Sequence, residues 1–251
     1  MFADQFGLDV DYQKIDAGPD EFAVALEDFR RAGGIGCNIT MPLKHDAWQL
    51  AVECSPQVGQ AQAANTLVYQ ASGWFAHNTD GVGLAADLTR NHALELKDRR
   101  ILILGAGGAT AGILGELLAA KPRQIMLVNR NLERADTLAQ RFNSLGEVKV
   151  TAWSELVRQD SFDLVINATS LGHQGKIPPL PGAVFAKDSV CYDLNYFKAS
   201  LPLQALCERI GQRYIDGLGM LVEQAAASFH IWTGKRADSS PVIKKLRDDQ
   251  Y

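Results

Sequence analysis

The sequence has few cysteines, and they show none of the spacings that make cysteine structural. Only four occur in the 251 residues, and they lie far apart: Cys37, Cys54, Cys191 and Cys207. Disulfide scaffolds and zinc sites need closely spaced ligands, so this distribution argues against both and indicates a reducing compartment. The five histidines lack ligand spacing as well, and no G-x-S-x-G turn is present. We therefore expect neither a bound metal nor a serine-hydrolase triad.

Long apolar runs and an excess of basic charge are also missing. No apolar stretch approaches the ~20 residues that a membrane-spanning helix needs. The opening residues MFADQFGLDV carry no signal-peptide pattern. The formal net charge is −4, so no basic field points to nucleic acid. We expect a cytoplasmic protein without membrane or nucleic-acid partners, and its 47% hydrophobic residues are enough to bury a full core.

Strand-like and helix-like segments alternate from the start of the chain. Apolar spacing, with glycine, proline and polar residues at the segment ends, predicts the elements. They are a strand over 8–15, a helix over 19–34, a strand over 35–41, a short helix over 45–54, a hairpin over 65–78 and a helix over 80–92. The charged stretch LKDRR at 96–100 follows, and we interpret it as a domain boundary.

Beyond this boundary, short apolar runs alternate with helical segments. The run ILILGAGGATAGILGELLAA over 101–120 predicts a buried strand, a glycine turn and a helix. Further strands are predicted over 124–130, 148–153, 162–170 and 190–196, and helices over 131–142, 201–211, 217–234 and 241–249. This alternation is typical of βαβ units around a parallel sheet buried on both faces, so we predict an α/β fold.

The strongest local signal is the glycine turn in ILILGAGGATAG. Gly105 and Gly107 fit the G-x-G-x-x-G pattern, whereas Thr110 occupies the third position and Gly108 is extra. Glycines let the backbone approach a pyrophosphate, and the N-terminus of a helix offers free N–H groups. Ordinary strand–helix turns also use glycine, but the strand–turn–helix context favours a dinucleotide site. Asn167, Thr169 and Ser170, in INATSLG at the end of another strand, could bind the cofactor or cap turns.

The end of the next strand indicates which dinucleotide is bound. Units that bind NAD usually carry an acidic residue there, which holds the ribose 2′-hydroxyl. In LVNRNLER that position is taken by Asn129 and Arg130, and Arg134 follows one helical turn later. Arginines can make charge-assisted bonds to a 2′-phosphate. The alternative is that Asn129 caps the helix and both arginines are solvated, but the pattern favours NADP over NAD.

A second set of polar residues surrounds Lys44 in CNITMPLKHD. Asn38 and Thr40 alternate with apolar residues just before it, Asn65 opens the hairpin, and Asp80 in HNTDG stands at a strand-to-helix turn. Together they supply a cation, a carboxylate and neutral hydrogen-bonding groups. A polyhydroxylated substrate would require such a set, although a lysine after a proline turn can also be an ordinary surface residue.

Seven motifs, in this order, resemble those of the shikimate/quinate dehydrogenase family. They are NITMPLK, AANTL, NTDGVG, GAGGA, NRNLER, INATSLG and DGLGMLVEQAA. The resemblance implies a two-domain α/β enzyme that reversibly reduces 3-dehydroshikimate to shikimate with NADPH in aromatic amino-acid biosynthesis. The alternatives are a dehydrogenase of quinate or another cyclic polyol, and an NADP-binding protein with an impaired substrate domain.

The resemblance also implies roles for individual residues. Lys44 is the expected catalytic acid/base, paired with Asp80. The expected substrate-binding residues are Asn38, Thr40, Lys44, Asn65, Asp80, Tyr196 and Gln224. The expected cofactor-binding residues are Gly105, Ala106, Gly107, Gly108, Ala109, Asn129, Arg130, Arg134, Thr169, Leu194 and Gly217.

By the same resemblance, residues 1–96 form a substrate domain with a mainly parallel sheet, completed by C-terminal helices at about 234–251. Residues 97–233 form a Rossmann-like NADP-binding domain. The sequence is silent on the oligomeric state, and a homodimer stays one alternative. The start of the chain departs from the family, which begins with a strand and a serine-bearing loop that holds the substrate carboxylate. This chain begins with MFADQFGLDVDY, in what resembles the first helix. We therefore expect that strand and that anchor to be missing, with weaker substrate binding and intact NADPH binding.

Overall fold

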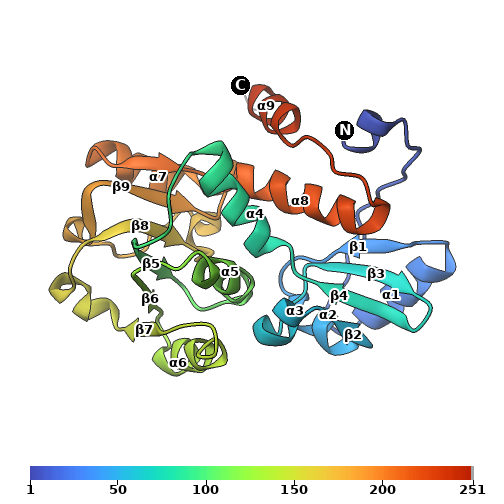
Figure 1. Ribbon diagram of the computed structural model, residues 1–251, viewed down its shortest axis with the longest axis horizontal. Coiled ribbons are helices and arrows are strands. Elements are labelled where there is room, and N and C mark those ends of the chain that lie inside the picture. The colour runs from blue at the N-terminus through green and yellow to red at the C-terminus, as the bar shows by residue number, and fades with distance from the viewer. Residues whose placement is uncertain (250–251) are drawn as a thin grey trace.

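The computed structural model describes residues 1–249, which fold around two β-sheets (Figure 1). The first sheet has four strands, in the order β1 (Gly36–Asn38), β3 (Thr66–Gln70), β4 (Gly73–His77) and β2 (Glu53–Cys54). The second has six strands, in the order β10 (Arg213–Ile215), β9 (Phe185–Asp193), β8 (Phe162–Asn167), β5 (Arg100–Leu104), β6 (Gln124–Val128) and β7 (Val148–Thr151). All neighbouring strands of the second sheet are parallel, as the sequence predicted.

Helices accompany both sheets, and two of them connect the sheets. Near the first sheet lie α1 (Phe22–Arg31), α2 (Lys44–Leu50) and α3 (Pro56–Ala61). Near the second lie α5 (Gly108–Ala119), α6 (Leu132–Arg141) and α7 (Leu201–Arg209). The connecting helices are α4 (Asp80–Ala86), which continues as the π-helix η2 (Asp87–Asn91), and α8 (Leu218–Thr233), which α9 (Ser240–Asp248) follows. Short 3-10 turns are η1 (Ala3–Phe6), η3 (Trp153–Arg158), η4 (Leu171–Gln174), η5 (Gly182–Val184) and η6 (Phe197–Ala199).

The first sheet departs from the sequence prediction at one edge. The predicted hairpin is confirmed as the antiparallel pair of β3 and β4. β3 is also antiparallel to β1, and β2 is parallel to β4. Three strands, β1, β4 and β2, therefore point in one direction and β3 points in the opposite direction. The strand predicted over 8–15 is wrong, because residues 8–18 form neither helix nor strand and, within 1–249, β1 pairs with β3 alone. Its apolar side chains are 49% (Val10), 64% (Tyr12) and 55% (Ile15) exposed, so no packed surface holds the segment in a ladder.

Two further boundaries differ from the prediction. The helix predicted over 45–54 ends at Leu50, and the chain then forms β2, which pairs with the edge of β4. The helix predicted over 80–92 changes from α to π geometry at Asp87. Both changes depend on tertiary partners that a local pattern does not contain. Of the C-terminal segment predicted over 234–251, residues 250–251 lie outside the described part of the chain.

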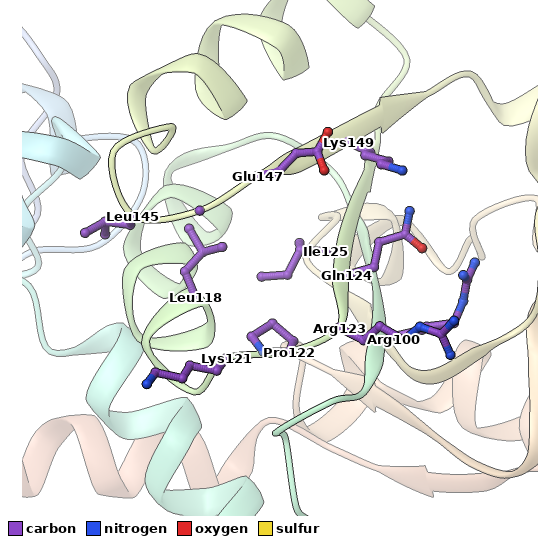
Figure 2. A pocket seen from close by; sticks show the side chains of 11 residues that line it. Arg100, Leu118, Lys121, Pro122, Arg123, Gln124, Ile125, Leu145, Glu147 and Lys149 are labelled. Atoms are coloured by element: carbon purple, nitrogen blue, oxygen red, sulfur yellow. The ribbon is translucent and has the colours of Figure 1, made fainter.

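The second sheet has a hollow at the edge where its parallel strands begin (Figure 2). Its volume is about 450 Å³, and its lining includes four basic residues: Arg100, Lys121, Arg123 and Lys149. Figure 2 shows the Lys121 side chain directed away from Arg100 and Arg123, so the basic groups do not converge on one point. Ligands of parallel sheets bind at the opposite edge, where the strands end, so the functional site is expected there.

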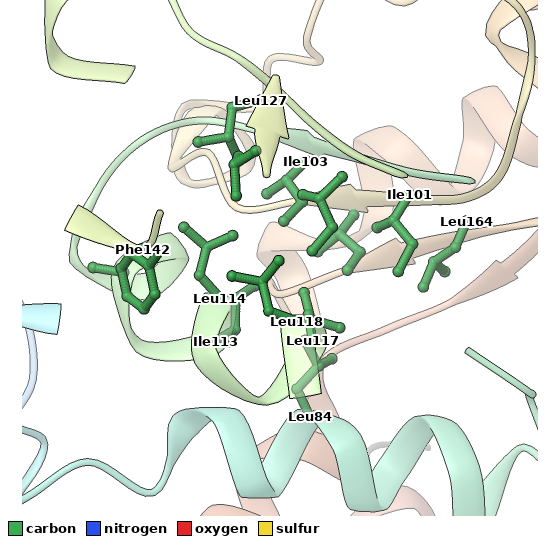
Figure 3. Packing of buried hydrophobic residues seen from close by; sticks show 14 of the residues in the cluster. Leu84, Ile101, Ile103, Ile113, Leu114, Leu117, Leu118, Leu127, Phe142 and Leu164 are labelled. Atoms are coloured by element: carbon green, nitrogen blue, oxygen red, sulfur yellow. The ribbon is translucent and has the colours of Figure 1, made fainter. Parts of the chain in front are cut away.

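The core of the second sheet explains why its strands read as continuous apolar runs. Ile101 and Ile103 of β5 pack into one hydrophobic cluster, while Leu102 and Leu104 pack into another on the opposite face. Figure 3 shows α5 facing the first of these clusters with Ile113, Leu114, Leu117 and Leu118. A strand buried on both faces has no polar side to expose, so strict alternation is absent.

Helices α4 and α8 pack closely because glycines face the partner helix. A Cβ atom built at Gly83 of α4 would lie 2.7 Å from Cβ of Gln224 in α8. A Cβ atom at Gly219 of α8 would collide with the Asp87 carboxylate. Farther along α8, Trp232 Nε1 donates to the Leu67 carbonyl of β3 over 2.9 Å. Thus α8 contacts both the connection to the second sheet and the first sheet.

No helix within 1–249 is long and apolar enough to cross a membrane.

The buried Asp87 carboxylate links η2 to the second sheet, and this leads to a stability prediction. Asp87 is 1% exposed, and its Oδ2 accepts a 2.6 Å hydrogen bond from the Tyr192 hydroxyl of β9. We expect Tyr192→Phe to lower the free energy of unfolding by about 1–3 kcal/mol, because it leaves a buried acceptor without its donor. Urea unfolding measures this, with Tyr69→Phe (41% exposed) as the control. Equal losses in both variants would contradict the assigned role of Tyr192.

Candidate active site

The two residues predicted to act in proton transfer form an ion pair. Lys44 is the first residue of α2, and Asp80 is the first residue of α4, directly after β4 and its connecting turn. Lys44 Nζ lies 2.6 Å from Asp80 Oδ2, and the two side chains are 16% and 7% exposed. A lysine ammonium and a carboxylate are therefore held together in a mostly buried place, which a surface lysine after a proline turn would not show.

Asn65, just before β3, fixes the other oxygen of that carboxylate. Its Nδ2 donates to Asp80 Oδ1 over 2.9 Å and to Gln224 Oε1 over 3.1 Å. Its Oδ1 accepts from the Thr79 backbone N–H over 2.8 Å, so the orientation of the amide is set from both ends. Both Asp80 oxygens thus have donors, and Asp80, Lys44 and Asn65 form a connected polar group, here called the Lys44 group.

The remaining predicted substrate residues are distributed unequally. Gln224, from α8, accepts directly from Asn65, and Asn38, at the end of β1, is linked to Asn65 through the Thr66 hydroxyl. Thr40 is exposed and makes no side-chain hydrogen bond with the described residues. Tyr196 follows β9 in the second sheet, is 36% exposed, and stacks edge-on with Phe197 rather than with the Lys44 group. Hydrogen bonds and the ion pair therefore join Asn38, Lys44, Asn65, Asp80 and Gln224, whereas Thr40 and Tyr196 make no side-chain hydrogen bond to them among the described residues.

The glycine turn joins β5 to α5 in the predicted strand–turn–helix arrangement. Gly105 has a φ of +102°, which only glycine adopts readily, and a Cβ there would lie 3.2 Å from the Ala168 carbonyl oxygen. Thr110 is fully buried, and its hydroxyl donates to the Gly105 carbonyl over 2.8 Å. The threonine in the third position of the pattern thus closes the turn. A Cβ at Gly108 would meet no atom within 4 Å, so the space at the start of α5 is open.

Arg134 reaches the same turn from α6. Its Nε donates to the Ala106 carbonyl over 2.8 Å, and both Arg134 and Arg130 are exposed residues. The cap of α6 is Asn131, whose side chain accepts from the Arg134 backbone N–H, so the alternative that Asn129 caps this helix is wrong. Asn129 instead donates to the Asn131 carbonyl over 2.8 Å. Two arginines therefore lie at the carboxyl edge of the sheet next to the glycine turn.

The other predicted cofactor residues lie at the ends of β8, β9 and β10. Thr169 donates through its hydroxyl to Asn167 Oδ1 over 2.7 Å, and the Leu194 N–H donates to the Asn167 carbonyl over 2.9 Å. A Cβ at Gly217 would collide with the Leu194 carbonyl. These residues share the edge at which β5 reaches the glycine turn. Within 1–249 there is no group of three or more histidine, cysteine or acidic residues that could hold a metal ion.

Helix α5 brings this edge close to the Lys44 group. A Cβ built at Gly112 of α5 would lie 2.9 Å from Asp80 Oδ2 and 2.9 Å from Asn78 Nδ2. The helix that begins at the glycine turn therefore passes directly beside the Asp80 carboxylate, four residues after Gly108. The two sets of residues that the sequence predicted separately thus lie beside the same helix.

Three polar residues of the site, Thr66, Asp193 and Ser228, were not singled out from the sequence, whereas Asn167 belongs to the INATSLG motif that was. Asn167 and Asp193 bond to each other at the ends of β8 and β9, and Thr66 and Ser228 lie beside Asn65 and Asn38. Asn167 and Asp193 directly follow apolar strand runs, which was a usable signal. Thr66 and Ser228 carried no local signal, because their contacts join β1, β3 and α8.

Asp193 leads to a prediction of pH dependence. Burial raises its pKa from 3.8 to about 6, against the opposing hydrogen bonds from Asn195, Asn167 and Tyr214. Between about pH 4 and about pH 6, Asp193 is therefore protonated in the native state, whereas in the unfolded chain it has already lost its proton. Protonated Asp193 stabilises the native state at acid pH, and this contribution is lost as the pH rises through that range, by at most about 1.4 kcal/mol per pH unit.

Urea unfolding of the wild type and of Asp193→Asn measures this contribution. The wild-type free energy of unfolding, relative to that of the variant, should fall between about pH 4 and about pH 6 and then stay level. A difference that is constant, or that rises, over this range would contradict the assignment.

Comparisons with known proteins agree with one another. Residues 1–67 match the family model of the shikimate dehydrogenase substrate binding domain, residues 87–174 that of shikimate / quinate 5-dehydrogenase, and residues 217–247 that of the shikimate 5′-dehydrogenase C-terminal domain. Shikimate dehydrogenase (NADP(+)) of Coxiella burnetii (strain Dugway 5J108-111) is 46% identical over 248 residues, which are 98% of this chain and 91% of that protein.

Two solved structures extend this similarity to three dimensions. An Ael1 enzyme from Pseudomonas putida has a TM-score of 0.89 and 37% identity, covering 98% of this chain and 90% of that one. Shikimate 5-dehydrogenase from Thermus thermophilus, in complex with NADP(H) and shikimate, has a TM-score of 0.83 and 28% identity, covering 98% and 91%. Sequence and structure therefore point to the same group of enzymes.

Proposed function

The chain belongs to the shikimate/quinate dehydrogenase family, and on that premise we propose that it catalyses the reversible, NADP-dependent reduction of 3-dehydroshikimate to shikimate. The observation that carries this proposal is the Lys44–Asp80 pair, held at 2.6 Å beside the helix that begins at the glycine turn. In this proposal residues 1–96 form the substrate domain and residues 97–233 form the NADP-binding domain, from which Gln224 of α8 reaches the substrate side. This reaction belongs to aromatic amino-acid biosynthesis. A cytoplasmic location stays a prediction from the sequence, and a homodimer stays one alternative for the assembly.

The residues at the carboxyl edge of the second sheet fit NADP. The open space at Gly108, together with the free N–H groups at the start of α5, suits a pyrophosphate. Arg130 and Arg134 supply the positive charge that a 2′-phosphate requires. Thr169, Leu194 and Gly217 lie along the same edge and would contact the rest of the cofactor. When bound, NADPH supplies the hydride for the carbonyl carbon.

In this proposal the Lys44 group carries out the proton transfer. In the reduction, the Lys44 ammonium donates a proton to the substrate oxygen as that oxygen becomes a hydroxyl, and Asp80 holds the lysine in place through its 2.6 Å contact. In the oxidation, the pair accepts the hydroxyl proton. Asn38, Asn65 and Gln224 bind and orient the other substrate hydroxyls. Gly112 of α5 keeps Asp80 close to the cofactor side, since a larger side chain there would displace the carboxylate.

The proposal is tested by following NADPH formation from NADP⁺ with shikimate, with quinate and without substrate. We expect turnover of shikimate, and much slower turnover when NAD⁺ replaces NADP⁺. Faster turnover of quinate would favour the polyol alternative. Binding of NADP⁺ without turnover of either compound would favour the impaired NADP-binding protein and contradict the proposal.

A further inference from the structure

A fully buried serine lies at the centre of the polar contacts behind the site. Ser228 is on α8, one turn after Gln224, and is 0% exposed. Its Oγ lies 3.0 Å from Asn38 Nδ2, 2.7 Å from Thr66 Oγ1 and 3.2 Å from Thr79 Oγ1. One hydroxyl therefore contacts β1, β3 and the turn before α4 at once.

The direction of these hydrogen bonds follows from the chemistry of the groups. The Asn38 amide nitrogen can only donate, so Ser228 Oγ accepts from it. The Thr66 hydroxyl donates to Asn65 Oδ1 over 2.8 Å, so it accepts from Ser228. Ser228 could instead donate to the Gln224 carbonyl, but that contact is 3.1 Å and the contact with Thr66 is 2.7 Å. Each group in the chain therefore donates a hydrogen bond to the next: Asn38 to Ser228, Ser228 to Thr66, and Thr66 to Asn65.

We propose that Ser228 is a positioning residue that sets the orientation of the Asn38 amide for substrate binding. This inference rests on the function proposed above. With Nδ2 held by Ser228, Asn38 Oδ1 is turned to the side where the Tyr12 hydroxyl donates to it over 2.8 Å. That side borders a hollow lined by Tyr12, Asn38 and Thr40. Asn38 therefore offers an acceptor, not a donor, to a hydroxyl of the bound substrate.

The Lys44 group does not depend on Ser228. Asn65 Oδ1 also accepts from the Thr79 backbone N–H over 2.8 Å, and Asn65 Nδ2 stays on Asp80. If the Ser228 hydroxyl is removed, Asn38 Nδ2 retains only longer contacts, at 3.3 Å to Thr66 Oγ1 and 3.4 Å to the Asn65 carbonyl. Loss of Ser228 should therefore weaken substrate binding without changing the proton-transfer step.

Steady-state kinetics of Ser228→Ala, in the full 251-residue chain, test this inference. We expect the KM for shikimate to rise about three- to ten-fold, as the weakening of one neutral hydrogen bond produces. The kcat, its pH profile and the KM for NADP⁺ should stay within about two-fold of wild type. Ser189→Ala is the matched control, because Ser189 is 2% exposed and its hydroxyl has no partner among the described residues. It should leave all these values unchanged.

A double-mutant cycle with Asn38→Ala shows whether Ser228 acts through Asn38. In the Asn38→Ala background, Ser228→Ala should no longer raise the KM. If Ser228→Ala does not fold, Ser228→Cys keeps a similar shape with a weaker acceptor and should raise the KM by a smaller factor. The inference would be overturned by an unchanged KM for shikimate. It would also be overturned if kcat fell as much as the KM rose, or if the pH profile of kcat shifted. An inactive wild type would instead contradict the proposed function.

Discussion

Lys44→Ala is expected to lower kcat about 10²–10⁴-fold, the range that a positioned general acid or base contributes. The variant loses the only ammonium placed within 2.6 Å of the Asp80 carboxylate among the described residues. NADP⁺ affinity should be unchanged, because Lys44 begins α2 beside the first sheet and its side chain makes no hydrogen bond with the glycine turn among the described residues. Initial rates and a separate fluorescence titration with NADPH measure the two quantities.

Lys149→Ala is a matched control for this experiment. It removes the same side chain from an exposed position in the hollow of Figure 2, at the edge where the strands of the second sheet begin. We expect its kcat to equal that of the wild type. If Lys44→Ala keeps a kcat within about two-fold of the wild type, then another group carries the proton and the proposed role of Lys44 is wrong.

Arg130→Ala is expected to weaken NADP(H) binding about 10- to 150-fold and to leave NAD(H) binding nearly unchanged. The reason is the loss of a charge-assisted contact to the 2′-phosphate, which costs roughly 1.5–3 kcal/mol. NAD lacks this phosphate and does not depend on the contact. Arg134→Ala should act in the same direction, with an added loss for both cofactors because Arg134 also holds the Ala106 carbonyl of the glycine turn.

Dissociation constants of both cofactors, measured by fluorescence or calorimetry, test this selectivity. Arg123→Ala is the control, since Arg123 lies in the hollow at the opposite edge of the sheet. Equal losses of NADP(H) and NAD(H) affinity in Arg130→Ala would mean that Arg130 does not contact the 2′-phosphate, and the sequence argument from LVNRNLER would be wrong.

Five of the six strands of the second sheet could be predicted from the sequence because they carry their own evidence, whereas the short edge strand β10 was not predicted. Runs such as ILILG and QIMLV are apolar on both faces, and helical segments separate them. The segment at 8–15 has similar β-forming residues, yet it forms no strand. A strand needs a partner as well as a suitable composition, and within 1–249 β1 pairs with β3 alone. The local sequence pattern therefore predicts strands that have neighbours on both sides better than it predicts the strands at the edge of a sheet.

The same limit applies to the site. Lys44, Asp80 and Asn65 were predicted individually, since each stands at the end of an apolar element. Their distances could not be predicted, and neither could Ser228, which reads as one small residue in an apolar helix. Its contacts depend on α8 returning across the first sheet, which is a property of the tertiary fold. Thr110 was visible in the sequence, but its role was not. It departs from the glycine pattern at the third position, and the structure shows that its hydroxyl closes the turn.

The most direct test of the account is a crystal structure of the protein with shikimate bound. We predict that one hydroxyl oxygen of shikimate lies within about 2.6–3.2 Å of Lys44 Nζ. A second hydroxyl should donate to Asn38 Oδ1 in place of Tyr12. Shikimate found in the hollow lined by Arg100, Lys121 and Arg123, or bound with no oxygen near Lys44, would contradict the claim that the Lys44–Asp80 pair is the active site.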